Sequence, residues 1–310
     1  MEIIDSTKQS ILIIGGTGFI GSQVAEEALS RQLNVTIISQ GLSSITDRID
    51  DVEYLAVDIT QRDELFLKLK NRVFDYVVNL AGYIDHSNYF KNGDKVVDVH
   101  FDGTRNIVEF INKKDLKTYI HFGSSDEYGS NVAPQIESQK ELPFSSYSFA
   151  KTASTHFLQM LHLTEKFPAV IFRPFLVYGP RQENSRFIPQ VILGCLDDKV
   201  FPTSYGMQLR DFCFITDIVD AVFLTINNAD AYGEVINIGS GEAISIKEII
   251  TTIQNIIGLG RPQFGKVAYR DGENMELFAN INKAKKLLNW KPRINLQNGL
   301  KKTINYYSNK

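Results

Sequence analysis

The feature that most constrains the fold is an apolar run followed at once by closely spaced glycines. Residues 11–14 are all apolar, which is typical of a parallel strand buried on both faces. The next segment, Gly15–Gly21, has the spacing G-x-x-G-x-x-G, and a helical pattern continues from Phe19 to Arg31. Such a turn exposes backbone N–H groups and the positive end of the helix dipole, and so suits a pyrophosphate. We therefore expect a dinucleotide to bind here, rather than a glycine turn with no ligand.

Strand and helix patterns then alternate along the first half of the chain. Strands are expected at 35–38, 54–57, 76–80, 118–122 and 169–172, and helices at 63–71, 95–112 and 147–166. This alternation indicates βαβ units and a parallel sheet. The second half is less regular, with helices expected at 217–227, 245–257 and 282–288. We predict a doubly wound α/β domain over 1–175 and a smaller α/β lobe over 176–310, interleaved with the last strands of the sheet.

Composition excludes several classes of protein. The 33 Lys and Arg residues and 36 Asp and Glu residues give a net charge of −3, which argues against a nucleic-acid-binding protein. The first ten residues carry charges and do not resemble a signal peptide, and no apolar run is long enough for a membrane span. A cytoplasmic protein is therefore expected. Cys195 and Cys213 lie in no ligand pattern, so we expect free buried thiols and no metal site.

A phenol and an ammonium are placed to act together. Tyr147 and Lys151 are four residues apart in a predicted helix and so share a face. A nearby ammonium lowers the pKa of a tyrosine, so that the phenol can exchange a proton with a carbonyl or alcohol near neutral pH. Ser124 follows the fifth predicted strand, at the edge where such sheets bind ligands. We expect Ser124, Tyr147 and Lys151 to be catalytic, with Ser125 as the alternative serine.

The end of the second predicted strand bears on the choice between NAD and NADP. A carboxylate there usually accepts hydrogen bonds from the 2′-hydroxyl of NAD. This chain has Ser39 and Gln40 instead, and Arg48 lies close enough in sequence to reach a 2′-phosphate. The sequence therefore favours NADP, with NAD as the alternative.

In combination, these motifs resemble the extended short-chain dehydrogenase/reductase family. The resemblance covers residues 9–305 and rests on Gly15–Gly21, Asp58, Asn79–Gly82, Ser124, Tyr147 with Lys151, and Arg173–Pro180. It implies a Rossmann-type domain and a C-terminal lobe that binds a nucleotide-linked sugar. It also implies that Asp58 faces the adenine and that Pro174–Val177 lies by the nicotinamide. The cofactor-binding residues implied in this way are Gly15, Thr17, Gly18, Phe19, Ile20, Gly21, Ser39, Asp58, Ile59, Leu80, Ala81, Gly82, Tyr147, Lys151, Pro174 and Val177.

The resemblance extends to the expected sugar-nucleotide site. There an apolar wall with a tyrosine suits the base, arginines suit the diphosphate through their planar donors, and Glu273 suits ribose hydroxyls. The substrate-binding residues expected are Ser125, Asp126, Pro202, Tyr205, Arg210, Arg270 and Glu273.

The reaction that best fits the pattern is NADPH-dependent reduction of the C4 carbonyl of a nucleotide-linked 4-keto-6-deoxyhexose, in activated deoxysugar biosynthesis. The alternatives are a 4-epimerase or a 4,6-dehydratase with bound NAD and, more distantly, a cofactor-sensing protein without activity. Dehydratases carry Thr-Asp-Glu where this chain has Ser124, Ser125 and Asp126. A one-residue deletion in the loop would instead align Ser125, Asp126 and Glu127, so dehydration stays open.

Two further expectations follow from the resemblance. The family often has an asparagine where this chain has His100, three residues before Gly103. A core role is expected for His100 rather than a role as proton donor. The family commonly dimerises through the helices near 95–112 and 147–166, so a homodimer is predicted.

Overall fold

The computed structural model describes residues 8–41, 48–270 and 272–309. The expectation of no signal peptide falls mostly on residues 1–7 and so lies outside the described part of the chain. Within the described residues the chain forms two compact units. The first takes in residues of Met1–Gly129, Lys140–Arg173 and Val219–Ile236, and the second takes in Ser130–Gln139, Pro174–Ile218 and residues of Asn237–Lys310. The predicted boundary near residue 175 stays a prediction.

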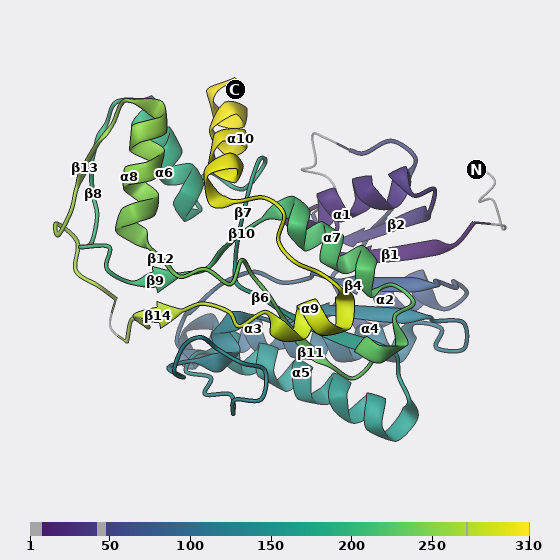
Figure 1. The fold of residues 1–310 in the computed structure, drawn as a ribbon. Coiled ribbons are helices and arrows are strands. Elements are labelled where there is room, and N and C mark those ends of the chain that lie inside the picture. Colours follow the sequence, from purple (N-terminus) through teal and green to yellow (C-terminus); the bar gives the residue numbers. More distant parts are fainter. Residues whose placement is uncertain (1–7, 42–47, 271, 310) are drawn as a thin grey trace. The chain divides into compact units, whose positions relative to one another are not determined.

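The first unit is built on a seven-stranded sheet with the order β11-β6-β5-β4-β1-β2-β3 (Figure 1). Neighbours from β3 to β6 pair in parallel, which confirms the predicted doubly wound sheet. The order reverses at β1, because the chain moves outward from it in both directions. The strands are β1 (Ser10–Ile14), β2 (Asn34–Ser39), β3 (Val52–Ala56), β4 (Tyr76–Asn79), β5 (Thr118–Phe122), β6 (Ala169–Pro174) and β11 (Val235–Ile238).

Helices cover both faces of this sheet: α1 lies over one face, and α4 and α5 lie over the other (Figure 1). They are α1 (Phe19–Ser30), α2 (Arg62–Leu69), α3 (Asp94–Val97), α4 (Gly103–Phe110), α5 (Ser146–Glu165) and α7 (Ile215–Thr225). The helix predicted over 95–112 is present as α3, a π-helical turn (Asp98–Asp102) and α4. In this turn the carbonyl of His100 accepts side-chain hydrogen bonds from Thr104 (2.7 Å) and Ser154 (2.9 Å).

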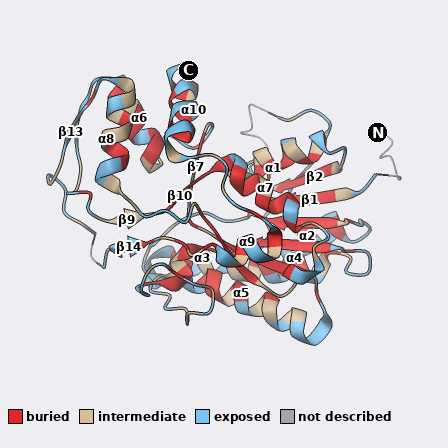
Figure 2. Ribbon diagram, viewed as in Figure 1, coloured by how far each residue is buried: buried red, intermediate tan, exposed pale blue. Residues whose placement is uncertain are grey.

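The core of the first unit lies between the sheet and its helices. Figure 2 shows the central strands as almost continuously buried. Leu12 and Val77 from the strands are fully buried with Ile107 of α4 and Leu158 of α5. Continuous apolar strands are what a sheet covered on both faces requires.

The second unit contains small sheets and four helices. Strand β7 (Leu176–Tyr178) pairs in parallel with β10 (Phe212–Phe214), and β8 (Val200–Pro202) pairs with β13 (Arg261–Gln263). Strand β9 (Leu209–Arg210) lies between β12 (Ile244–Ser245) and β14 (Glu276–Leu277). The helices are α6 (Phe187–Leu196), α8 (Ile246–Ile257), α9 (Asn282–Leu288) and α10 (Leu296–Ser308).

Two of these helices are missing from the sequence prediction. Helix α6 is apolar almost throughout and contains Pro189 and Gly194, so it shows neither an amphipathic period nor a clean boundary. Helix α10 contains Gly299, and in the sequence a glycine indicates the end of a helix rather than its middle. An ideal Cβ at Gly299 would lie 2.1 Å from the hydroxyl of Tyr178, so packing requires the glycine. No helix among the described residues is both long and apolar enough to cross a bilayer.

A fully buried ion pair joins β6 to the turn after β5. The guanidinium of Arg173, in β6, lies 2.8 Å from a carboxylate oxygen of Glu127, and neither side chain is exposed. Arg173 also pairs with Glu141 at 2.6 Å. The carboxylate of Glu127 accepts further hydrogen bonds from the backbone N–H of Ser124 (2.8 Å) and the hydroxyl of Thr155 (2.9 Å). This carboxylate therefore connects β5, β6 and α5.

We expect Glu127→Gln to destabilise the fold strongly. Removing one partner of a buried ion pair costs about 3–5 kcal/mol, because the other charge stays buried. The same change in an exposed pair, Asp102→Asn opposite Arg105, should cost less than about 1 kcal/mol. Urea unfolding of both variants measures the difference. Equal losses in the two variants would contradict the role given to Glu127.

Candidate active site

The parallel register brings the ends of the five strands β1 to β5 to one edge of the sheet, with Ile38 of β2 paired to Leu55 of β3. Ile14 is paired with both Ile38 and Asn79, and Asn79 is paired with His121. The segments that follow these strands carry most of the predicted cofactor and catalytic residues of the first unit. They therefore start side by side, at the carboxyl edge where doubly wound sheets bind ligands.

The glycine turn after β1 fits a dinucleotide. Gly15 has a φ of +76°, and an ideal Cβ there would lie 3.0 Å from backbone atoms of Leu80. A Cβ at Gly21 would lie 2.4 Å from the carbonyl oxygen of Gly15, whereas at Gly18 the nearest atom is 3.3 Å away. Helix α1 begins after Gly18 with no side-chain cap and no acidic residue in its first turn. Its first N–H groups therefore suit an anion such as a pyrophosphate.

Polar side chains from β2 and β3 meet beside this turn. The hydroxyl of Ser39 lies 2.8 Å from that of Thr17. The amide of Gln40 donates to the carboxylate of Asp58 at 3.0 Å, and Asp58 also accepts from the backbone and hydroxyl of Thr60. A carboxylate thus lies next to the carboxyl end of β2, although it belongs to the segment after β3 and not to β2 itself. The sequence pattern did not predict this contact of Gln40 with Asp58.

The segment after β4 is held by a buried asparagine. The side-chain amide of Asn79 donates to the hydroxyls of Thr104 (3.2 Å) and Tyr119 (3.1 Å), and its oxygen accepts from the N–H of Ala81 (3.1 Å). Gly82 follows with a φ of +125°. Predicted cofactor residue Ile59, after β3, accepts a hydrogen bond from Asn106 through its carbonyl.

The ammonium of Lys151 is buried next to Tyr147. Both residues lie near the start of α5, where the side chain of Ser145 caps the helix. The ammonium donates to the carbonyl of Phe122 at 2.6 Å and lies 5.9 Å from the centre of the Tyr147 ring. Burial lowers the pKa of Lys151 to about 8, partly offset by the carboxylate of Glu127. The structure thus brings Tyr147 and Lys151 together as predicted from their spacing.

His100 packs against both Tyr147 and Gly82. Its ring lies 5.1 Å from the Tyr147 ring in an edge-to-face arrangement, and an ideal Cβ at Gly82 would lie 1.9 Å from the imidazole. Burial, followed by the charge of Lys151, lowers the pKa of His100 to about 3, so the imidazole is neutral. Nε2 lies 2.9 Å from the carbonyl of Tyr83 and must donate to it. His100 is therefore a buried packing residue, as expected.

The four residues of the turn after β5, Ser124 to Glu127, differ in burial and in hydrogen bonding. Ser124 and Glu127 form a reciprocal cap on a 3₁₀ turn (Ser125–Tyr128), in which the Ser124 hydroxyl accepts from the N–H of Asp126. Ser125 is buried and Glu127 is fully buried in its ion pair. Only Asp126 keeps a partly exposed carboxylate, at 27%. Glu127 therefore cannot supply the exposed second acid that the shifted alignment Ser125-Asp126-Glu127 would need for dehydration.

Sequence reasoning missed one residue near the candidate catalytic tyrosine. His86 follows β4, and its ring lies 5.6 Å from the Tyr147 ring at an interplanar angle of 80°. Its Nε2 lies 3.9 Å from a carboxylate oxygen of Asp126, and its side chain is 39% exposed. A lone histidine in a loop carries no periodic signal, and only the tertiary fold brings it to Tyr147.

The second unit holds most of the predicted substrate residues. Arg210, in β9, forms an ion pair with Glu273, and both side chains are largely buried. Tyr205 is 64% exposed and Arg270 is exposed, while Pro202 ends β8. The remaining predicted residues of this unit are Pro174, at the end of β6, and Val177, in β7.

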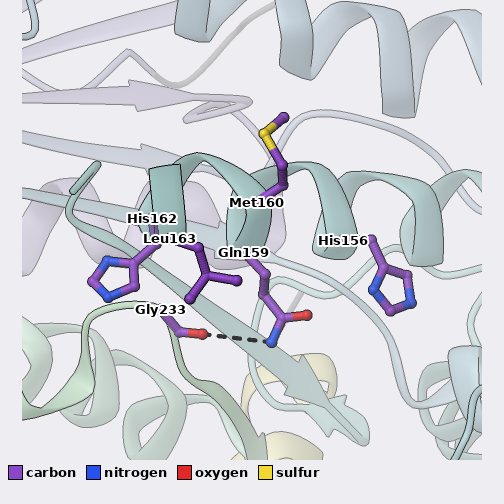
Figure 3. Close-up of a pocket in the computed structure, with 6 residues that line it drawn as sticks. All are labelled: His156, Gln159, Met160, His162, Leu163 and Gly233. Carbon is purple, nitrogen blue, oxygen red and sulfur yellow. Dashed lines mark hydrogen bonds between the residues drawn. The ribbon is translucent and has the colours of Figure 1, made fainter. Parts of the chain in front are cut away.

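A surface pocket on α5 is distinct from the candidate site. Figure 3 shows it lined by His156, Gln159, Met160, His162, Leu163 and Gly233. Its first lining residue lies nine positions after Tyr147, or about 14 Å along a helix. Among the described residues, no group of three or more His, Cys, Asp or Glu side chains is arranged to hold a metal ion.

Similarity to known proteins agrees with this geometry. The chain is 28% identical to a UDP-glucuronate 4-epimerase of Thermodesulfobacterium geofontis, with 95% of each chain covered. It is 27% identical to a dTDP-D-glucose 4,6-dehydratase of Bos taurus, over 98% of this chain and 90% of that protein. Among solved structures, the UDP-glucuronic acid 4-epimerase of Bacillus cereus in complex with UDP-glucuronic acid and NAD is 28% identical, with a TM-score of 0.84 over 97% of this chain and 99% of that one.

These relatives are epimerases and dehydratases rather than the ketoreductases to which the sequence was expected to be most similar. The family itself is shown directly, because residues 11–239 match its sequence pattern. The chain belongs to the NAD dependent epimerase/dehydratase family.

Proposed function

We propose that this protein is a nucleotide-sugar 4-epimerase that retains NAD. The observation that carries the proposal is the placing of Tyr147, buried Lys151 and the Ser124 turn at one sheet edge with a glycine turn that fits a dinucleotide. The relatives that are 4-epimerases support the same reading. Dehydration is disfavoured, because Glu127 is occupied by Arg173 and leaves Asp126 as the exposed acid of its turn.

The chain's own residues have distinct roles in this proposal. The phenol of Tyr147 removes the proton from the sugar O4 hydroxyl and later returns it. The ammonium of Lys151 favours the phenolate, and the hydroxyl of Ser124 donates a hydrogen bond to O4. When bound, a nicotinamide dinucleotide supplies reversible hydride transfer at C4. The backbone N–H groups after Gly18 would hold its pyrophosphate, and Ser39 and Asp58 would contact its adenosine.

We propose NAD rather than NADP as the retained cofactor. The solved Bacillus cereus relative binds NAD. Arg48 had been expected to bind a 2′-phosphate, but its guanidinium lies over the Tyr54 ring, 5.4 Å from the ring centre. The second unit would bind the sugar nucleotide: Pro202 and Tyr205 against the base, Arg210 and Arg270 at the diphosphate, and Glu273 at the ribose.

One observation favours a second candidate, the NADPH-dependent 4-ketoreductase. The end of β2 carries Ser39 and Gln40 and no carboxylate of its own, which suits NADP. The two candidates differ in whether a cofactor is consumed, because an epimerase returns the hydride that it removes.

Cofactor content and consumption therefore test the proposed function. We expect acid-released nucleotide from the purified protein to be NAD, and we expect UDP-glucuronate or UDP-glucose to be converted to its C4 epimer with no added cofactor. Chromatography of the products measures both. Stoichiometric loss of NADPH with a nucleotide-linked 4-keto sugar, and no epimerisation, would support the reductase instead. Bound dinucleotide with neither reaction and no dehydration would support the cofactor-sensing alternative.

We expect Tyr147→Phe to remove the general acid–base group and leave the fold intact. Loss of such a group lowers the rate about 10²–10⁴-fold. Turnover with the best substrate is compared with that of Tyr89→Phe, an exposed tyrosine of the same unit. Turnover within a few fold of wild type in Tyr147→Phe would show that another residue transfers the proton.

We expect Lys151→Met to abolish turnover and yet stabilise the nucleotide-free protein at pH 7. The folded-state pKa of about 8 lies below the ordinary value of 10.5, so folding disfavours the charged form. At about 1.4 kcal/mol per pH unit, the cost of burying the charge is on the order of 3 kcal/mol.

The stability difference between Lys151→Met and wild type should change with pH in a definite direction. Below pH 8 both states of Lys151 are protonated and the cost is fully present. Between pH 8 and 10.5 the unfolded state binds more protons, so wild-type stability rises and the advantage of Lys151→Met disappears. Urea unfolding at pH 7 and pH 10 measures the change, with the exposed Lys114→Met as control. A variant less stable than wild type at pH 7 would show that the ammonium is a net stabilising group.

A further inference from the structure

His86 and Asp126 form a polar pair beside Tyr147 that the mechanism above does not use. The imidazole lies edge-to-face with the phenol ring, 5.6 Å between centres, and its Nε2 is 3.9 Å from the Asp126 carboxylate. With 39% and 27% of their side chains exposed, both groups are accessible to solvent and to a ligand. They come from different loops, after β4 and after β5, and all three residues belong to the first unit.

The pair joins two loops that are far apart in the sequence. The cap of the turn after β5 is formed by Ser124 and Glu127, so the carboxylate of Asp126 has no part in that cap. The acid next to His86 in sequence, Asp85, bonds the backbone N–H of Ser87 at 2.8 Å and so stabilises its own turn. Of the two carboxylates near His86, that of Asp85 is therefore bonded to the backbone of its own loop, and that of Asp126 faces the imidazole.

Chemistry at O4 makes the neighbouring carbons acidic. When a sugar carries a carbonyl at C4, loss of a proton from C3 or C5 gives an enolate whose charge lies on O4. In the proposed function Tyr147 binds O4, so these carbons lie two bonds from the atom that the phenol contacts. An imidazole packed against the phenol ring lies next to the side chain that binds O4, which is the region where a base for these carbons is needed.

We propose that His86, positioned by Asp126, is a second general acid–base group, which exchanges a proton on a carbon next to C4 of a nucleotide-linked 4-keto sugar. The C–H bond breaks, its proton goes to the imidazole, and its electron pair forms the enolate, whose oxygen is hydrogen-bonded by Tyr147. The imidazolium then returns a proton to the same carbon. No oxidant or reductant is consumed. The result is solvent exchange at that carbon and, if the proton returns on the opposite face, epimerisation there.

The inference rests on the proposed function only for the binding of the sugar nucleotide at Tyr147. A 4-keto sugar supplied ready-made needs no hydride transfer to exchange a proton. In 4-epimerisation, by contrast, the C4 hydrogen leaves and returns as hydride, so carbon gains no deuterium from the solvent. Deuterium on carbon therefore reports the second activity alone.

The test incubates the protein as purified with UDP- or dTDP-4-keto-6-deoxyglucose in D₂O. Mass spectrometry and NMR measure deuterium at C3 and C5 against the rate without protein. We expect incorporation with wild type and a fall of about 10²–10⁴-fold with His86→Ala. Free imidazole should restore much of the exchange to His86→Ala, which a purely structural role would not permit. Asp126→Asn should lower the exchange rate less than His86→Ala.

The control is Asp85→Asn, which removes a charge from the same loop and keeps an oxygen for the N–H of Ser87. It should exchange at the wild-type rate. Wild type that exchanges no faster than buffer with either nucleotide overturns the proposal, even if UDP-sugars are epimerised at C4. Undiminished exchange in His86→Ala also overturns it. A failure of the proposed function alone would appear as normal exchange without C4 epimerisation.

Discussion

The interaction on which the rest of the site depends is the buried carboxylate of Glu127. It accepts from the N–H of Ser124 after β5, from the hydroxyl of Thr155 in α5, and from the guanidinium of Arg173 in β6. The two elements that carry the candidate catalytic residues, the turn after β5 and α5, are thus tied to each other and to β6 by one charged group. Because hydrogen bonds to a buried charge are stronger and more expensive to lose than neutral ones, this arrangement restricts the position of Ser124 relative to α5.

The buried ammonium of Lys151 brings a positive charge close to the Tyr147 ring. Lys151 lies buried near His100 and His121, and burial, with the charge of Lys151, lowers the pKa values of both histidines. Both imidazoles are therefore neutral, and the lysine ammonium is the group whose positive charge can act on Tyr147. The cost of burying that ammonium falls on stability, which is a common property of active sites. The buried Glu127 carboxylate partly offsets it.

The turn after β5 also limits which reactions on the sugar its carboxylates can support. Ser124 and Glu127 are committed to each other and to the core, whereas Asp126 faces the exposed His86. A dehydration needs an acid and a base on neighbouring carbons, and one partly exposed carboxylate in this turn does not supply both. Proton exchange next to a carbonyl needs only one base. The same geometry that disfavours elimination therefore suits the single-base chemistry proposed for His86.

The sequence by itself determined the fold class, the positions of the first six strands along the chain and the pairing of Tyr147 with Lys151. These features depend on periodicity and on spacing within one helix, which are local and survive without a tertiary context. It also identified the glycine turn, because glycine has a strict backbone role there. Helices α6 and α10 could not be predicted from the sequence. Helix α6 is almost continuously apolar and α10 contains a glycine, so neither shows the amphipathic period on which such predictions depend.

The tertiary structure decided which polar groups are available for chemistry. Glu127 and Asp126 are adjacent carboxylates in the sequence, yet Glu127 is buried in the core against Arg173 and Asp126 is partly exposed. His86 lies far in sequence from Tyr147 and joins it only because β4 and β5 are neighbours in a parallel sheet. Burial and long-range charge pairing depend on how separate strands align, and no single segment of sequence encodes that alignment.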